Sequence, residues 1–106
     1  MKYKPNRRTI TAFDTVFNVT ADFYGVSVEE ILGRRRYQAI VEPRFVSIHL
    51  AKMISKNIAW ASIGWYVDRD HQSCMYADSQ VRAWKDTDKK FAAKLEQVAR
   101  RVASVL

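Results

Sequence analysis

Cysteine, proline and glycine are scarce in this chain, and each scarcity excludes a class of protein. A single cysteine, Cys74, cannot form an intramolecular disulfide, so a disulfide-stapled secreted domain is excluded and a reducing cytoplasmic setting is expected. Two prolines leave long stretches without a helix breaker. The three glycines, at positions 25, 33 and 64, cannot build a phosphate-cradling loop with Lys and Ser or Thr, which excludes ATP hydrolysis by that route.

Long hydrophobic runs are absent as well. No apolar stretch approaches the roughly 20 residues needed to span a bilayer, and no secretory signal is visible, so we expect no membrane partner. The chain does have enough apolar material for a core, because 48% of its 106 residues are hydrophobic and 12% are aromatic. This composition argues against disorder and predicts one domain that folds alone.

Positive charge is in excess. Eighteen Lys and Arg against eleven Asp and Glu give a net charge of +7, which favours an anionic partner such as nucleic acid or an acidic membrane. Residues 1–10 are expected to form a basic, flexible N-terminal arm, either solvated or touching DNA, with its charge on Lys2, Lys4, Arg7 and Arg8. Residues 11–106 are expected to form the single domain.

Apolar residues recur at helical spacing almost throughout the chain. Helices are predicted from about 11 to 24, from 28 to 32, from 43 to about 56 and from 58 to about 67. Two more follow, one capped by Asp70 and one capped within 86–88. Ser27 and Glu30 form a capping box, and Gly33 ends that short helix. No strand alternation is visible, so the predicted fold class is all-α, a compact bundle of about six helices.

The helix that begins near Pro43 is expected to be amphipathic. Pro43 itself suits a first turn, where its missing N–H would have had no partner. One face is expected to be buried and carries Val46, Leu50, Met53 and Ile54. The other face is expected to be available to solvent or ligand and carries Arg44, Ser47 and Lys52.

Two segments carry the strongest functional signal. The first places Arg34, Arg35 and Arg36 in a loop before a helix, which suits phosphate contacts or insertion into a minor groove; the plainer alternative is a solvated loop. The second, 69–72, places polar side chains at the start of a helix, where a helix-turn-helix reads base edges. Two helices joined by a three-residue turn, with supporting helices around them, describe such a domain.

The order and spacing of several short segments are typical of one protein family. Over roughly residues 11–106 the chain resembles the C-terminal DNA-binding domain of the bacterial chromosomal replication initiator DnaA, which has a TrpR-like helix-turn-helix fold. The resemblance rests on the order and spacing of Tyr24-Gly25-Val26, Gly33-Arg34-Arg35-Arg36, Glu42-Pro43-Arg44, Leu50-Ala51-Lys52, Ser62-Ile63-Gly64 and Arg69-Asp70-His71. Because the chain begins with Met a few residues before this domain, we expect a free-standing protein rather than a domain excised from an initiator.

The resemblance implies roles for the matching residues. Arg36 is expected to enter the minor groove, while Asp70 and His71 meet bases in the major groove. Gln72 stands where the family usually has a threonine, so we expect a base contact that favours adenine. Phosphate contacts are expected from Arg34, Arg35, Arg44, Lys52 and Arg69.

Other positions depart from the family. Gln38 and Glu42 replace family arginines, which removes phosphate charge. The family's glycine-containing turn is shortened to Val67-Asp68, so the tilt of the recognition helix is expected to differ.

These observations predict sequence-specific binding of double-stranded DNA, in replication-origin control or transcriptional regulation, by a cytoplasmic protein of the bacterial nucleoid with no enzyme activity and no cofactor. The alternative is a helical protein-interaction adaptor whose basic charge is incidental. One basic face shared by the 34–36 loop, Lys52 and the start of the helix at Asp70 favours DNA, whereas dispersed charge beside an apolar groove favours the adaptor. The apolar stripe of the last helix packs on the domain or forms the seam of a weak homodimer.

Three features are given structural interpretations. His49, in the middle of a helix, is expected to be packed or hydrogen-bonded rather than a ligand. His71 and Cys74 have the spacing of two metal ligands, but no second pair completes a tetrahedral zinc site. The three tryptophans, Trp60, Trp65 and Trp84, are expected in the core, with Trp65 on a partner surface if it is exposed.

Overall fold

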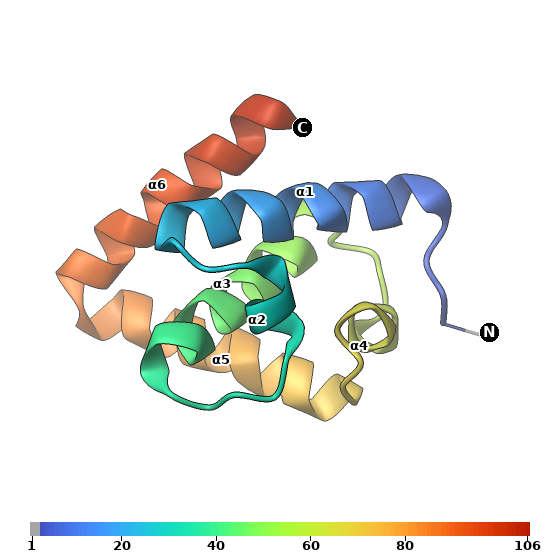
Figure 1. Ribbon diagram of the computed structural model, residues 1–106, viewed down its shortest axis with the longest axis horizontal. Coiled ribbons are helices and arrows are strands. Elements are labelled where there is room, and N and C mark those ends of the chain that lie inside the picture. The colour runs from blue at the N-terminus through green and yellow to red at the C-terminus, as the bar shows by residue number, and fades with distance from the viewer. Residues whose placement is uncertain (1–2) are drawn as a thin grey trace.

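The computed structural model describes residues 3–106, which fold into six α-helices and contain no strand (Figure 1). Met1 and Lys2, which belong to the expected basic arm, lie outside the described residues. The all-α prediction is therefore confirmed over the described part of the chain. The helices are α1 (Arg7–Tyr24), α2 (Val28–Leu32), α3 (Gln38–Ile54), α4 (Trp60–Val67), α5 (His71–Thr87) and α6 (Lys89–Val105).

Helix α3 lies at the centre of the bundle, and α1, α2, α4 and α5 pack on it (Figure 1). Its buried residues lie on every side of the helix, not on one face. Two expectations for α3 are therefore wrong: Met53, expected in the core, is 52% exposed, and Arg44 and Ser47, expected to be accessible, are buried. The amphipathic rule assumes that one face meets solvent, and a helix covered on all sides does not obey it.

The start of α3 also differs from the prediction. The helix begins at Gln38, five residues before Pro43, so Pro43 lies inside the helix and not in its first turn. The carbonyl of Tyr37 starts the helix by accepting hydrogen bonds from the N–H groups of Ile40 at 2.9 Å and Val41 at 3.0 Å. The missing N–H of Pro43 then removes one bond further along the helix. As a result, the loop expected over 34–42 is reduced to residues 33–37.

Helix α1 begins at Arg7, four residues before the expected start near residue 11. The side chain of Asn6 caps it, because Asn6 Oδ1 accepts a hydrogen bond from the N–H of Thr9 at 2.9 Å. The expected flexible arm over residues 1–10 is therefore wrong for residues 7–10, which are helical. The capping box at Ser27 and Glu30 and the cap at Asp70 are confirmed, and the cap expected within 86–88 is Asp88.

The apolar stripe of α6 packs inside the domain, against α1 and α5. Its buried side chains are Phe91, Leu95, Val98 and Val102. Of the stripe, Val105 remains exposed, so a homodimer seam along α6 would have little of it to use. The three tryptophans are half-buried, and Trp60 and Trp84 pack against the core, as expected for these two. Across residues 3–106, no helix is both long enough and apolar enough to pass through a bilayer.

Candidate nucleic-acid interface

A tight turn joins α4 to α5 and sets the angle between them. Asp68 ends α4 in the left-handed conformation, with φ of 57°, and the N–H groups of Asp68 and Arg69 both donate to the carbonyl of Gly64. Gly64 has no side chain to obstruct this close approach, since a Cβ there would overlap the carbonyl oxygen of Arg69. Aspartate tolerates the left-handed conformation because its short polar side chain bonds locally. Helices α4 and α5 thus form the predicted helix-turn-helix.

Asp70 fixes the first turn of α5. Its Oδ1 accepts a hydrogen bond from the N–H of Ser73 at 2.8 Å, and this bond lowers the pKa of the Asp70 carboxyl below its usual value. The carboxylate therefore stays charged at neutral pH at the N-terminal end of the helix, where negative charge is favourable. His71, Gln72 and Ser73 follow in the first turn, and all three are exposed.

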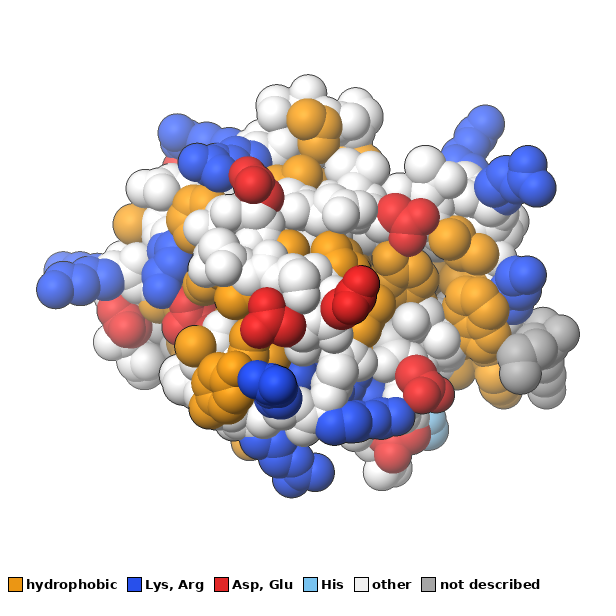
Figure 2. All heavy atoms as spheres, in the orientation of Figure 1, with side chains coloured by type: hydrophobic (Ala, Val, Ile, Leu, Met, Phe, Trp, Pro, Cys, Tyr) orange, Lys and Arg blue, Asp and Glu red, His pale blue; other side chains and the backbone are white. Residues whose placement is uncertain are grey.

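The segment 33–37, which we call the arginine loop, and the start of α5 line one groove of about 660 Å³. Arginines contribute from three elements, and α3 adds apolar side chains. The loop and α3 supply Arg34, Arg36 and Arg44, and the turn and α5 supply Arg69, Asp70, Gln72, Ser73 and Tyr76. Figure 2 shows basic side chains, with acidic ones among them, over the lower part of the molecule, where the segment between α2 and α3 runs in Figure 1.

Arg44 holds the arginine loop from within. Its guanidinium donates to the carbonyls of Ile31 at 2.6 Å, Arg35 at 2.8 Å and Gly33 at 3.0 Å, and the residue is only 5% exposed. Burial lowers its pKa, and the nearby charges of other arginines lower it further. The expected availability of Arg44 to a phosphate is therefore wrong, because its donors are used by backbone carbonyls that the sequence pattern does not reveal.

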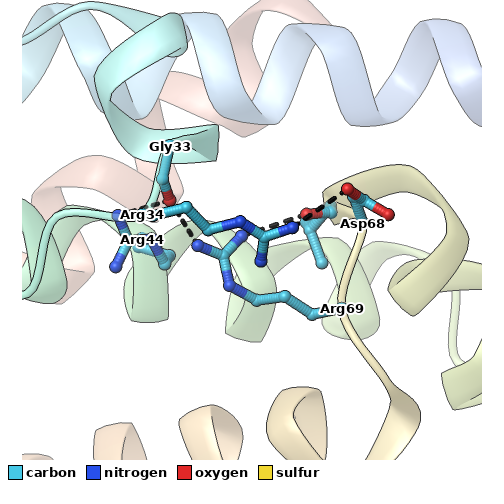
Figure 3. Close-up of polar contacts among 6 residues, drawn as sticks. Gly33, Arg34, Arg44, Asp68 and Arg69 are labelled. Carbon is cyan, nitrogen blue, oxygen red and sulfur yellow. Dashed lines mark hydrogen bonds and ion pairs between the residues drawn. The ribbon is translucent and has the colours of Figure 1, made fainter.

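Arg69 ties the same loop to the helix-turn-helix. It donates to the carbonyl of Gly33, which also accepts from Arg44, and to the carbonyl of Val67 at 3.0 Å (Figure 3). Burial lowers the pKa of Arg69, and the neighbouring charge of Arg34 acts in the same direction. Two guanidinium groups thus share one carbonyl oxygen, and this oxygen joins α3, the loop and the turn.

The three exposed arginines of the loop differ in their partners. Arg34 forms an ion pair with Asp68 at 3.0 Å, with both side chains largely in solvent (Figure 3). Arg35 donates to the hydroxyl of Tyr37 at 3.2 Å. Within residues 3–106, Arg36 forms neither a hydrogen bond nor an ion pair, although it lines the groove. Arg36 is therefore the loop guanidinium most available to a ligand.

Three of the expected site residues do not line the groove: Arg35, Lys52 and His71. Lys52 lies near the opposite end of α3, where its Nζ donates to the carbonyl of Ile58 at 2.5 Å and sits 5.0 Å from the centroid of the Trp60 ring. The expected basic face shared with Lys52 is therefore only partly formed. Glu42 pairs with Lys94 of α6 at 2.6 Å.

Two residues of α5 that line the groove, Ser73 and Tyr76, were not predicted as site residues, and neither were the apolar lining residues of α3, Val41, Phe45 and Ile48. Tyr76 is 58% exposed, and its ring meets the edge of Phe45 with centroids 6.1 Å apart. Tyr76 follows Gln72 by four positions, so both lie on one side of α5. This spacing is the feature of the sequence that could have identified Tyr76 as a groove residue.

A buried polar pair joins the central helix to α5. His49 Nδ1 lies 2.7 Å from Asp78 Oδ1, and the other carboxylate oxygen of Asp78 lies 3.1 Å from Arg82 Nε. The interpretation of His49 as a hydrogen-bonded core residue is confirmed. The pair contributes to the position of α5 because it links the two helices at a buried point.

Comparisons with known proteins cover the same part of the chain. The family model described as the bacterial DnaA protein helix-turn-helix matches residues 13–81, which include the arginine loop, the turn and α5 as far as residue 81. The chromosomal replication initiator protein DnaA of Acholeplasma laidlawii (strain PG-8A) is 26% identical over 106 residues, covering 99% of this chain and 23% of that protein. The chain thus spans about a quarter of the length of this curated relative. The predicted resemblance is confirmed, and since the model matches more than half of the chain, the chain belongs to the bacterial DnaA helix-turn-helix family.

Proposed function

We propose that this chain binds double-stranded DNA in a sequence-specific way, with the start of α5 in the major groove and the arginine loop at the minor groove and phosphates. The observation that carries the proposal is that Arg36 and Gln72 line one groove although 36 positions separate them in the sequence. A cation without an internal partner and a side chain with a paired donor and acceptor meet there. These are the groups that a duplex binds by shape and by base edge.

Each side chain has a separate role in this interface. Arg36 enters the narrow, electronegative minor groove. Gln72 offers a donor and an acceptor to adenine, and the Asp70 carboxylate accepts from the amino group of cytosine. Arg34 and Arg35 approach phosphates. His71, exposed at the first residue of α5, contacts the base step next to Gln72.

Arg44 and Arg69 act through the loop. Their guanidinium groups hold the Gly33 carbonyl and fix where Arg36 projects. They are positioning residues, and we do not count them among the phosphate contacts.

The relative is called a chromosomal replication initiator, and this name supports a role at replication origins; control of transcription is the second possibility within the same activity. Either role places the chain on the bacterial nucleoid in the cytoplasm. The charge of the groove counts against the adaptor alternative, because four arginines line it and an acidic ligand complements them better than an apolar partner segment does.

Selection of bound duplexes from a random pool, followed by sequencing, tests this proposal. We expect one enriched motif with an A·T-rich flank, and a slope of log affinity against log salt of roughly −3, because the three cations Arg34, Arg35 and Arg36 displace counterions from the duplex. The Lys90→Gln variant is the control. It removes one positive charge far from the groove, where α5 ends and α6 begins. No enriched motif together with a slope near zero would overturn the proposal.

A further inference from the structure

Residues 3–6, which we call the leader, are fixed against the domain. Pro5 is buried, and Asn6 caps α1. The Nζ of Lys4 lies 5.7 Å from the centroid of the Trp65 ring, within the range of a cation–π contact. The leader runs back from α1 to α4 and does not extend freely into solvent.

The leader reaches the start of the recognition helix from the side opposite the arginine loop. Tyr3 lines a second hollow, of about 450 Å³, together with Ala61, Gly64 and Trp65 of α4 and residues 68–70 of the turn. This hollow and the groove of the arginine loop share Arg69 and Asp70. The first turn of α5 is therefore flanked by the arginine loop on one side and by the leader on the other.

The lining of this second hollow carries the charges of Asp68, Arg69 and Asp70, and Lys4 of the leader lies beside it, over the Trp65 ring. Asp68 is paired with Arg34, and Asp70 is held by the N–H of Ser73. Lys4 forms no ion pair with a carboxylate within residues 3–106, so its ammonium keeps donors for another acceptor. In helix-turn-helix complexes, the first helix of the motif crosses the DNA backbone while the second lies in the major groove.

We propose that the leader is a second phosphate clamp, in which Lys4, oriented by the Trp65 ring, contacts the DNA backbone on the flank opposite the arginine loop. This inference rests on the proposed function, because it needs α5 to enter the major groove. The leader and α4 would form a second DNA-binding surface. The arginine loop and the leader would then contact the DNA backbone on the two sides of α5.

The test compares the 106-residue chain with its Lys4→Gln and Lys90→Gln variants on the duplex selected from the random pool. The slope of log affinity against log salt should become shallower by about 1 for Lys4→Gln, because one phosphate contact is lost. Methylphosphonate substitution, one phosphate at a time, then locates that contact. We expect Lys4→Gln to abolish the sensitivity to one or two phosphates that differ from those affected by Arg34→Gln, with the melting temperature unchanged.

The outcomes separate the two proposals. If the wild-type chain binds with a clear salt slope, but Lys4→Gln behaves as Lys90→Gln does or loses the same phosphates as Arg34→Gln, the leader clamp is overturned and DNA binding stands. If the wild-type chain shows no salt-dependent binding to any duplex, both proposals are overturned.

Discussion

Arg36 on the arginine loop and Arg44 on the central helix line the same groove, yet their surroundings are opposite. Arg36 is exposed, while Arg44 is buried and donates to three backbone carbonyls at 2.6 to 3.0 Å. One guanidinium is free for a ligand, and the other fixes the loop that carries it. The comparison shows that the number of arginines in a cluster does not give the number of phosphate contacts.

Arg69 and Arg34, which both bond to the turn or the loop, differ in the same way as Arg44 and Arg36. Arg69 is partly buried and holds the Gly33 carbonyl, whereas Arg34 remains in solvent and pairs with Asp68. A loop held in place before the ligand arrives loses less conformational entropy on binding. The internal arginines therefore support affinity without contacting the ligand.

Replacing Arg44 should have the largest effect on stability. Arg44→Met removes a charged donor from several buried carbonyls, so we expect the free energy of unfolding to fall by about 3 kcal/mol or more. Urea denaturation measures this loss. Arg36→Met is the matched control and should change stability by less than about 0.5 kcal/mol, because an exposed side chain is replaced. Similar losses in the two variants would contradict the division between internal and external arginines.

Arg36, which should matter little for stability, should matter most for DNA affinity among the arginines of the loop. We expect Arg36→Ala to cost about 1 to 3 kcal/mol of binding free energy, since it removes an insertion that depends on groove shape as well as charge. Arg34→Ala and Arg35→Ala should each cost less, because these side chains already have the partners Asp68 and Tyr37. Fluorescence anisotropy with a labelled duplex measures all three. Equal losses, with no change in sequence preference, would mean that the loop is only a diffuse charge.

Gln72 should affect one base pair and not overall affinity. Gln72→Thr exchanges a paired donor and acceptor for a hydroxyl and a methyl group, so about 1 to 3 kcal/mol of discrimination should be lost at a single position. A panel of duplexes with single-base substitutions measures this shift, which we expect to run towards the site of the family. The salt slope should not change. A uniform change across the panel would remove Gln72 from the reading surface.

The smallest expected effect is a gain. Asp68 repels phosphates and competes with them for Arg34, and an exposed ion pair contributes only about 0.2 to 1 kcal/mol. Asp68→Asn should therefore raise DNA affinity by about that amount, while asparagine still tolerates the left-handed conformation of the turn. Binding titrations at low salt measure the gain. Weaker binding by a variant with an unchanged melting temperature would show that Asp68 contributes to the interface.

Local signals were predictable, and long-range ones were not. The caps at Ser27, Asp70 and Asp88 depend on residues within three positions, and the sequence predicts them correctly. The burial of Arg44 depends on carbonyls 9 to 13 positions earlier in the sequence, which only the folded chain brings together. The placement of Pro43 fails for a related reason, because the helix start is set by Tyr37 and not by the proline.

The central claim is that the arginine loop and the start of α5 form one rigid reading surface. Inserting a single base pair between the motif read by α5 and its A·T-rich flank tests it most directly, since the insertion moves the flank by about 3.4 Å along the helix axis and rotates it. We predict that the wild-type chain then binds as weakly as Arg36→Ala binds the original duplex, and that Arg36→Ala loses little more. Unchanged binding of the wild-type chain to the duplex with the insertion would contradict the account.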